Sequence, residues 1–295
     1  MSLPSELSQA LVAAGLDPGY VEDLVRAAVE EDLARGVDVT SEATVPRDQR
    51  ATGDLVARAP GVVAGLPVAE AAFVCASDDP LEIARTASDG DTASVGEVLW
   101  TATGPTRALL LAERTALNLL CHLSGVATAT RRWTDALADT GAVVRDTRKT
   151  TPLLRPLEKY AVRCGGGENH RMSLSDAALI KDNHIIAAGG ITAAYQAVTE
   201  VFPDVPVEIE VDSVDGAAEA AAAGAQVILL DNFKTAEVAK AVQAVEGRSK
   251  IEVSGGLTIY AARAYGETGV DYLAVGAITH SAPALDIAFD LREVR

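Results

Sequence analysis

A repeating unit shapes this sequence from about residue 140 onward: a short apolar run, a charged or glycine-bearing tip, then an Ala-rich stretch. The tips that follow residue 180 begin at residues 181, 210, 231, 254 and 276, so the repeat is 21 to 29 residues long. That length accommodates one strand and one crossover helix. Because near-continuous apolar runs are typical of parallel strands covered on both faces, the pattern predicts a parallel α/β sheet. Six successive runs favour a barrel over an open sheet; they are 142–144, 177–180, 207–209, 227–230, 251–253 and 272–275.

The stretches between these strands predict helices, among them residues 216–223 and 235–245. In both a barrel and an open parallel sheet, sites form at the carboxyl ends of the strands. We therefore expect the functional side chains at the tips, which are 145–149, 181–183, 210–212, 231–232, 254–256 and Gly276.

The first 110 residues or so lack this unit and predict a separate α+β domain. A helix over about 24–35 leads into a turn-rich piece at 35–40, and a long helix opens at Gly104-Pro105, with Pro105 in its first turn. Between them the patterns predict short strands at 51–58, 62–64 and 97–101 and a helix near 67–75.

Composition excludes several classes of partner. The formal net charge of -17, the pI of about 4.6 and the 4% aromatic content argue against nucleic-acid binding and against anionic membranes. The three cysteines, Cys75, Cys121 and Cys164, lack metal-ligand spacing and favour a reducing compartment. With neither a leader pattern nor a membrane-spanning apolar segment, we expect a soluble cytoplasmic protein.

Residues 145–181 form a basic island in this acidic chain. Eight Lys and Arg residues face four acidic ones there, for a net charge of +4, and His170 lies within the island. A small, highly anionic ligand explains such a local field best. A solvated charged loop is the alternative, but it does not explain the glycine run 165–167, which lets the chain turn sharply and bring His170 and Arg171 over the barrel mouth.

Paired cations within the island predict an anion site. Arginine binds a carboxylate or phosphate through two parallel hydrogen bonds, whereas lysine acts as a compact point charge. The candidates are Arg148, Lys149, His170, Arg171 and Lys181.

Two acidic tips predict a Mg²⁺ site. Glu210 and Asp231 follow successive strands, and their carboxylates suit a Mg²⁺ ion that keeps waters and phosphate oxygens as its other ligands. The alternative is that each caps a helix, but Asp212, directly before an Ala-rich stretch, is the expected cap.

Glycines at the last two tips predict a phosphate cup. Ser254, Gly255 and Gly256 end one predicted strand, and Gly276 ends the next. Glycines allow backbone N–H groups to approach phosphate oxygens closely, although the same residues also suit a tight turn.

Arg114 borders the apolar face of the long predicted helix, with Leu110, Leu111 and Leu117 one turn away. Position alone leaves two interpretations open. Its stem lies on hydrophobic surface, or its guanidinium reaches an anion through an interface.

Taken together, these motifs resemble the quinolinate phosphoribosyltransferase family of NAD biosynthesis over essentially the full length. Ser173, where relatives commonly carry Gly, is a small departure beside the site. The matching segments are EDLARGVDVTSEATVP, AERTALNLLCHLSGVATAT, DTRKTTPLLRPLEKYAVRCGGGENHR, LIKDNH, VEIEVDS, ILLDNF, VSGGLT and GVDYLAVGAITHS.

The resemblance implies a fold like that of type II phosphoribosyltransferases. It comprises an N-terminal open α/β sandwich domain, residues 1–112, and an incomplete α/β barrel of six to seven strands, residues 113–282. The segment 283–295 is expected to pack back on the N-terminal domain. The resemblance also implies a homodimer or higher oligomer whose sites are shared between subunits.

The resemblance implies conversion of quinolinate and 5-phosphoribosyl 1-pyrophosphate (PRPP), with Mg²⁺, to nicotinate mononucleotide, pyrophosphate and CO₂. The implied catalytic residues are Lys149, Glu210 and Asp231; Glu210 and Asp231 would meet Mg²⁺ and the ribose, and Lys149 or a water would protonate C2. The implied quinolinate ligands are Arg114 from the partner subunit, Arg148, His170, Arg171 and Lys181. The implied PRPP ligands are Lys149, Glu210, Asp231, Ser254, Gly255, Gly256 and Gly276.

Three alternatives stay open at this point. A relative acting on another heteroaromatic acid, such as nicotinate, would keep the residues predicted to bind PRPP. A non-catalytic anion-binding relative would not need Glu210, Asp231 and the phosphate glycines. A barrel lyase would use Lys181 as a Schiff base.

Overall fold

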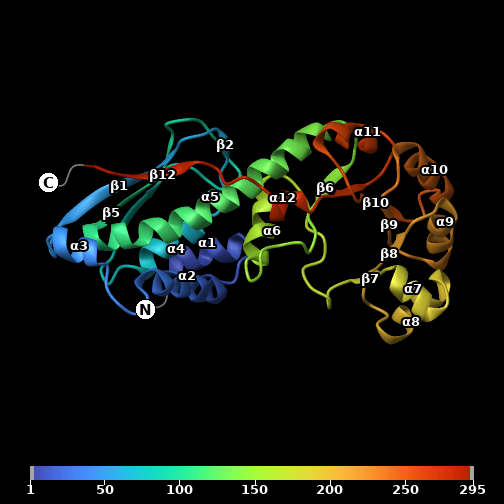
Figure 1. Ribbon diagram of the computed structural model, residues 1–295, viewed down its shortest axis with the longest axis horizontal. Coiled ribbons are helices and arrows are strands. Elements are labelled where there is room, and N and C mark those ends of the chain that lie inside the picture. The colour runs from blue at the N-terminus through green and yellow to red at the C-terminus, as the bar shows by residue number, and fades with distance from the viewer. Residues whose placement is uncertain (1–2, 293–295) are drawn as a thin grey trace. The chain divides into compact units, whose positions relative to one another are not determined.

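The computed structural model describes residues 3–292 and contains two compact units (Figure 1). The N-terminal unit comprises the chain up to Ala129, the segment Pro156–Gly165 and the residues from Ala282 onward. The barrel unit comprises Thr130–Arg155 and Gly166–Ser281. None of the helices within residues 3–292 has the length and apolar character needed to cross a bilayer.

The barrel unit is built on a six-stranded parallel sheet, which confirms the predicted α/β class. The strand order is β6-β11-β10-β9-β8-β7, and among the described residues β6 and β7 form no ladder with each other, so the sheet is an incomplete barrel. The strands are β6 (Val143–Arg145), β7 (Ala178–Ile180), β8 (Val207–Val211), β9 (Val227–Asp231), β10 (Lys250–Ser254) and β11 (Tyr272–Ala274).

Helices α8, α9 and α10 pack one against the next along this sheet (Figure 1). Ser213, whose side chain accepts a hydrogen bond from the Gly216 N–H at 3.2 Å, caps α9. The prediction of Asp212 as the cap was therefore wrong, because the residue one position later has the extended backbone that a cap requires. The helices are α7 (Asp182–Ala188), α8 (Ile191–Val201), α9 (Val214–Ala223), α10 (Thr235–Val245), η1 (Ile259–Ala261), α11 (Ala262–Gly266) and α12 (Ala277–His280).

The N-terminal unit contains an antiparallel sheet in the order β12-β1-β5-β3 and a two-stranded ladder of β2 and β4. Its strands are β1 (Arg50–Ala57), β2 (Gly61–Val62), β3 (Glu82–Arg85), β4 (Thr92–Ala93), β5 (Val98–Pro105) and β12 (Ile287–Leu291). Its helices are α1 (Ser5–Ala13), α2 (Pro18–Leu33), α3 (Val39–Thr44), α4 (Leu66–Cys75), α5 (Thr106–Ala136, whose last turns belong to the barrel unit) and α6 (Arg155–Cys164).

Local sequence signals were misread at two places in this unit. The turn-rich piece was predicted over residues 35–40, but its last two residues already belong to α3. The helix begins there because the Asp38 carboxylate accepts hydrogen bonds from the Thr40 and Ser41 N–H groups, each at 3.1 Å, and caps it. Pro105 was expected in the first turn of the long helix, but it is the last residue of β5, and α5 begins at Thr106.

The division between the units lies inside α5, at Ala129, whereas the sequence placed it at residue 112. Helix α6 belongs to the N-terminal unit, although the predicted boundaries assigned it to the barrel. Within the C-terminal segment 283–295, β12 pairs antiparallel with β1, and residues 293–295 lie outside the described residues.

Three aromatic rings pack together in the core of the N-terminal unit. The Phe73 ring lies 4.8 Å from the Trp100 ring and 5.1 Å from the Phe289 ring, centroid to centroid. On α5, a Cβ added to Gly125 would lie 2.2 Å from the carbonyl oxygen of Pro283, so the C-terminal segment reaches this helix only because that residue is glycine.

Candidate active site

A cavity of about 300 Å³ in the barrel unit collects the tips of its parallel strands. Seven predicted site residues line it: Arg148, Lys149, His170, Arg171, Lys181, Glu210 and Ser254. The other lining residues are Thr147, Leu179, Leu229, Glu252 and Ala274. The predicted residues Asp231, Gly255, Gly256 and Gly276 belong to the same unit but not to this lining, and Arg114 belongs to the N-terminal unit.

Arg148 and Arg171 give the cavity positive charge that its own carboxylates leave uncompensated. The Nε–H of each is buried and has no hydrogen-bond partner within residues 3–292, although Arg171 also donates from Nη1 to the Ala177 carbonyl at 2.9 Å. Burial, and then the neighbouring charge of Arg148, lowers the pKa of Arg171. Two guanidinium groups that repel each other in a half-buried cavity would both be stabilised by a bound dianion.

Lys181 and Glu210 form an ion pair at the wall of the cavity. Lys181 is the residue directly before α7, and Glu210 lies near the end of the neighbouring strand β8. A Schiff-base lysine needs a free amine to attack a carbonyl, whereas the Lys181 side chain is already bound to a carboxylate. The pair therefore argues against the lyase alternative.

Glu210 and Asp231 lie on adjacent strands with the same side-chain orientation. Glu210 is in register with Leu229, two residues before Asp231 on β9, and side chains two residues apart along a strand share a face. Asp231 is in register with Ser254 and accepts a hydrogen bond from Asn232 Nδ2 at 2.8 Å. Two carboxylates so placed fit the oxygen ligands of a hydrated Mg²⁺ ion.

Glycines shape the loops after β10 and β11. Gly255 has a φ of +92°, and a Cβ there would lie 2.2 Å from Asn232 Oδ1, so the close approach of these two loops requires glycine. A Cβ on Gly276 would lie 3.1 Å from the Lys149 side chain. The backbone carbonyl of Lys149 also accepts a hydrogen bond from Thr279 Oγ1 at 2.8 Å. The loop after β11 thus packs directly against a predicted catalytic residue.

His170 is buried, with only 7% of its surface exposed. Its backbone N–H donates to Asp146 at 2.9 Å, and its ring Nδ1 accepts from the Arg171 N–H at 2.8 Å. Its Nε2 lies 2.7 Å from Glu208 Oε2. The sequence predicted a ring that grips the ligand, whereas in the structure both ring nitrogens are engaged by the protein.

Sequence reasoning missed two carboxylates near His170, Glu208 and Glu252, and it gave no separate role to Arg145, which lies at a predicted tip and in the basic island. Glu208 and Glu252 lie inside β8 and β10, and Arg145 ends β6; its Nη1 is 2.8 Å from Glu252 Oε2. The signal was present, because a carboxylate in the middle of a strand buried on both faces needs a partner. The partner itself lies 107 residues away along the chain.

Arg114 lies on α5, and 63% of its side chain is exposed. Among the residues that the structure describes, its guanidinium forms one long ion pair, from Nη2 to Glu113 Oε1 at 3.9 Å. The exposed guanidinium is therefore accessible to an external anion, which is what the interface interpretation requires.

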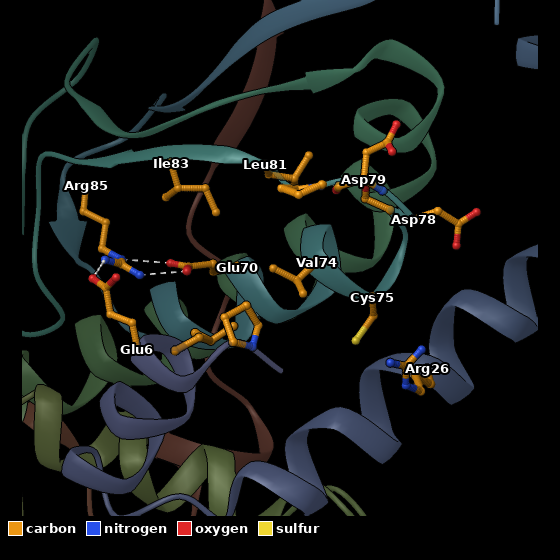
Figure 2. Close-up of a pocket in the computed structure, with 14 residues that line it drawn as sticks. Glu6, Arg26, Glu70, Val74, Cys75, Asp78, Asp79, Leu81, Ile83 and Arg85 are labelled. Atoms are coloured by element: carbon orange, nitrogen blue, oxygen red, sulfur yellow. Dashed lines mark hydrogen bonds and ion pairs between the residues drawn. The ribbon is translucent and has the colours of Figure 1, made fainter. Parts of the chain in front are cut away.

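A second cavity, of about 440 Å³, lies in the N-terminal unit (Figure 2). Arg85 points between two carboxylates there: its guanidinium binds Glu70 at 2.7 and 2.8 Å and Glu6 at 3.0 Å. Arg26, also in this lining, is paired with Glu22 at 2.8 Å. Because its cations are already neutralised, this cavity is a weaker anion site than the one in the barrel unit.

Comparison with known proteins covers both units. The model of the quinolinate phosphoribosyl transferase N-terminal domain matches residues 38–124, and that of the C-terminal domain matches residues 126–290. The carboxylating nicotinate-nucleotide pyrophosphorylase of Mycobacterium leprae is 48% identical over 276 residues, covering 91% of this chain and 96% of that protein. The probable enzyme of that name from Bacillus subtilis is 40% identical, over 88% of this chain and 90% of its own length. The structure of the nicotinate-nucleotide pyrophosphorylase from Francisella tularensis is 36% identical, with a TM-score of 0.89, over 93% of this chain and 96% of that one.

Proposed function

Because the chain belongs to the quinolinate phosphoribosyltransferase family, we propose that it converts quinolinate and PRPP to nicotinate mononucleotide, pyrophosphate and CO₂. This is a pentosyl transfer that supplies NAD biosynthesis. The observation that carries the assignment is the pair Arg148 and Arg171, whose buried Nε–H groups lack partners in the same cavity as Lys181 and Glu210.

The cations match a dicarboxylate. Quinolinate carries two carboxylates, and Arg148, Arg171 and Lys181 would hold them, with Lys149 close to both substrates. Nicotinate carries one carboxylate and would leave part of this positive charge unpaired. The surplus of cations thus supports the diacid over the nicotinate alternative.

The phosphate end completes the site. Glu210 and Asp231 would hold Mg²⁺ and the ribose hydroxyls, and the loops containing Ser254, Gly255, Gly256 and Gly276 would hold the 5′-phosphate. When bound, Mg²⁺ neutralises charge on the pyrophosphate.

Chemistry then follows from positioning. The pyridine nitrogen attacks the anomeric carbon as pyrophosphate leaves, and charge stabilisation of an oxocarbenium-like transition state dominates such a transfer. The ribosylated ring is a pyridinium, which accommodates the electron pair left at C2 when the adjacent carboxylate departs as CO₂. A proton then replaces CO₂ at C2.

Purified protein tests the assignment with quinolinate, PRPP and Mg²⁺, followed through nicotinate mononucleotide and CO₂. Nicotinate replaces quinolinate in a parallel reaction, and omission of Mg²⁺ tests the metal. Product and CO₂ from quinolinate alone are expected; turnover of nicotinate in place of quinolinate would reassign the base pocket.

A homodimer with shared sites is the assembly we propose, with Arg114 supplied by the partner subunit. The exposure of its guanidinium supports this. Arg114→Ala should abolish most activity, and mixing it with an inactive Lys149→Ala protein should restore part of it through hybrid dimers. Absence of recovery after demonstrated subunit exchange would mean that each site is self-contained.

We also propose a cytoplasmic location. The free cysteines Cys75, Cys121 and Cys164 support it, because disulfides are rare in reducing compartments.

A further inference from the structure

Four charged or titratable side chains meet at the wall of the barrel cavity: Arg145, His170, Glu208 and Glu252. Arg145 Nη1 lies 2.8 Å from Glu252 Oε2, and His170 Nε2 lies 2.7 Å from Glu208 Oε2 and 3.6 Å from Glu252 Oε1. We call these four residues the Arg-His-Glu-Glu cluster. His170 and Glu252 also line the cavity, so the cluster reaches the site directly.

The cluster is poorly explained as a stability element. Glu208 and Glu252 are buried, and Oε1 of each has no hydrogen-bond partner among the residues that the structure describes. Buried polar atoms without partners are costly, and apolar residues often replace buried ion pairs without loss of stability. Two such atoms beside a catalytic cavity therefore indicate a functional requirement.

Hydrogen bonds on both sides determine the state of the His170 ring. Nδ1 accepts from the Arg171 N–H at 2.8 Å, so its lone pair is occupied and the ring proton is on Nε2. That proton is donated to Glu208. The ring is thereby held in one tautomer and one orientation.

The ring in turn holds the residue that follows it. The Arg171 N–H is bound to His170, while the Arg171 guanidinium lines the cavity. Arg145 reinforces the same loop through a hydrogen bond from Nη2 to the Asn169 carbonyl at 3.3 Å. Strands β6, β8 and β10 thus converge on one short segment, residues 169–171.

We propose that Glu208 and Glu252 are positioning residues for the dicarboxylate: Glu208 through His170, and Glu252 through Arg145, hold segment 169–171 so that the Arg171 guanidinium faces the substrate. This inference deepens the proposed function and rests on it. Glu208 and Glu252 themselves need not touch the substrate.

The raised pKa of Glu252 shows that its charged form is energetically costly at this position, as expected for a residue kept for function. Burial, followed by the charge of Glu208 on β8, raises the pKa of Glu252 to about 7, and His170 and Arg145 oppose the rise. The remaining in-register neighbours are Tyr272 on β11, whose ring lies 4.3 Å below the Arg145 guanidinium, and Leu229 on β9, which is apolar.

Two substitutions at Glu208 separate positioning from folding. Glu208→Leu removes the acceptor of the His170 proton, whereas Glu208→Gln keeps an acceptor oxygen and removes the charge. We expect Glu208→Leu to raise the KM for quinolinate at least tenfold with the KM for PRPP within twofold of the wild type, and Glu208→Gln to recover most of the loss. Glu200→Gln, on an exposed position of α8, is the control.

Glu252→Leu tests the second arm, because it removes the acceptor of Arg145. It should raise the KM for quinolinate more than the KM for PRPP, and Glu252→Gln should raise it less. Equal changes in both KM values, or no change in either, would overturn the proposal, as would a failure of either glutamine variant to improve on the leucine variant.

A measurement without turnover separates this inference from the proposed function. Long-range ¹⁵N NMR reports the tautomer of each of the four histidines, and the His170 signal is assigned by its loss in His170→Gln. We expect His170 as the Nε2–H tautomer in the wild type and a mixture of tautomers in Glu208→Leu. An Nδ1–H tautomer in the wild type would refute the cluster. If the tautomer is as expected but quinolinate does not bind in calorimetry, the proposed function fails instead.

Discussion

Replacing Glu252 with glutamine should change how the stability of this protein depends on pH. In the folded protein the pKa of Glu252 is raised from 4.5 to about 7, mainly by burial and then by Glu208. Below pH 4.5 the carboxyl is protonated in both the folded and the unfolded chain. As the pH rises from there, the folded chain keeps a proton that the unfolded chain has lost, so stability falls until the pH passes about 7.

The size of the effect follows from the same values. Each pKa unit between 4.5 and about 7 corresponds to ~1.4 kcal/mol, so the ionisation of Glu252 removes about 3 kcal/mol of stability, most of it between pH 5 and pH 8. Glutamine resembles the protonated carboxyl in shape and does not titrate. Glu252→Gln should therefore gain about 2–3 kcal/mol relative to the wild type on going from pH 5 to pH 8.

Urea unfolding of both proteins at pH 5, 6, 7 and 8, at one protein concentration, measures this difference. Carboxyl groups remote from Glu252 titrate alike in both proteins and cancel in the comparison, and Glu200→Gln controls for the loss of a negative charge at an exposed position. A difference between Glu252→Gln and the wild type that stays constant across this range would refute the reasoning, because it would mean that the folded chain does not hold the proton at Glu252.

Three further predictions concern single residues. Arg148→Ala should weaken quinolinate binding by roughly 2–5 kcal/mol, measured by calorimetry, because the substrate carboxylate loses a half-buried partner; a change below twofold would remove Arg148 from the site. Gly255→Ala should raise the KM for PRPP and leave quinolinate affinity near that of the wild type, since the new Cβ would lie 2.2 Å from Asn232 Oδ1 and move the loop after β10; equal loss for both substrates would contradict a local role. Gly125→Ala should lower the free energy of unfolding by about 1–3 kcal/mol, because its Cβ would overlap the Pro283 carbonyl. An unchanged denaturant midpoint would contradict this, because it would mean that the C-terminal segment can move away from the new Cβ without loss of stability.

The ion pair between Lys181 and Glu210 links the two halves of the proposed site. Lys181 is expected to bind quinolinate, while Glu210 is expected to meet Mg²⁺ and the ribose, and in this structure they neutralise each other. A dicarboxylate that attracts Lys181 would leave Glu210 more available to a cation. The two substrates therefore meet at residues that already interact.

Local patterns in the sequence were sufficient to locate the parallel strands of the barrel unit. The spacing of the apolar runs located all six of its parallel strands, and helix α10 occupies the predicted residues 235–245. The tips placed Arg148, Lys181 and Glu210 at one edge of the sheet, where they line one cavity. Such features are readable because strand and helix periodicity, and the common direction of parallel strands, are properties of short segments.

The pairing of the buried charges depends on the tertiary structure. Nothing near Glu252 in the sequence indicates Arg145, 107 residues earlier, and nothing near His170 indicates Glu208. The basic island suggested a histidine open to ligand, yet the fold buries its ring and engages both nitrogens. Likewise, the assignment of α6 to the N-terminal unit and the pairing of β12 with β1 depend on distant partners. Residue type and spacing determine which side chains carry charge and which edge of the sheet they occupy, but the pairing of those charges depends on strand order and register, which only the packed chain sets.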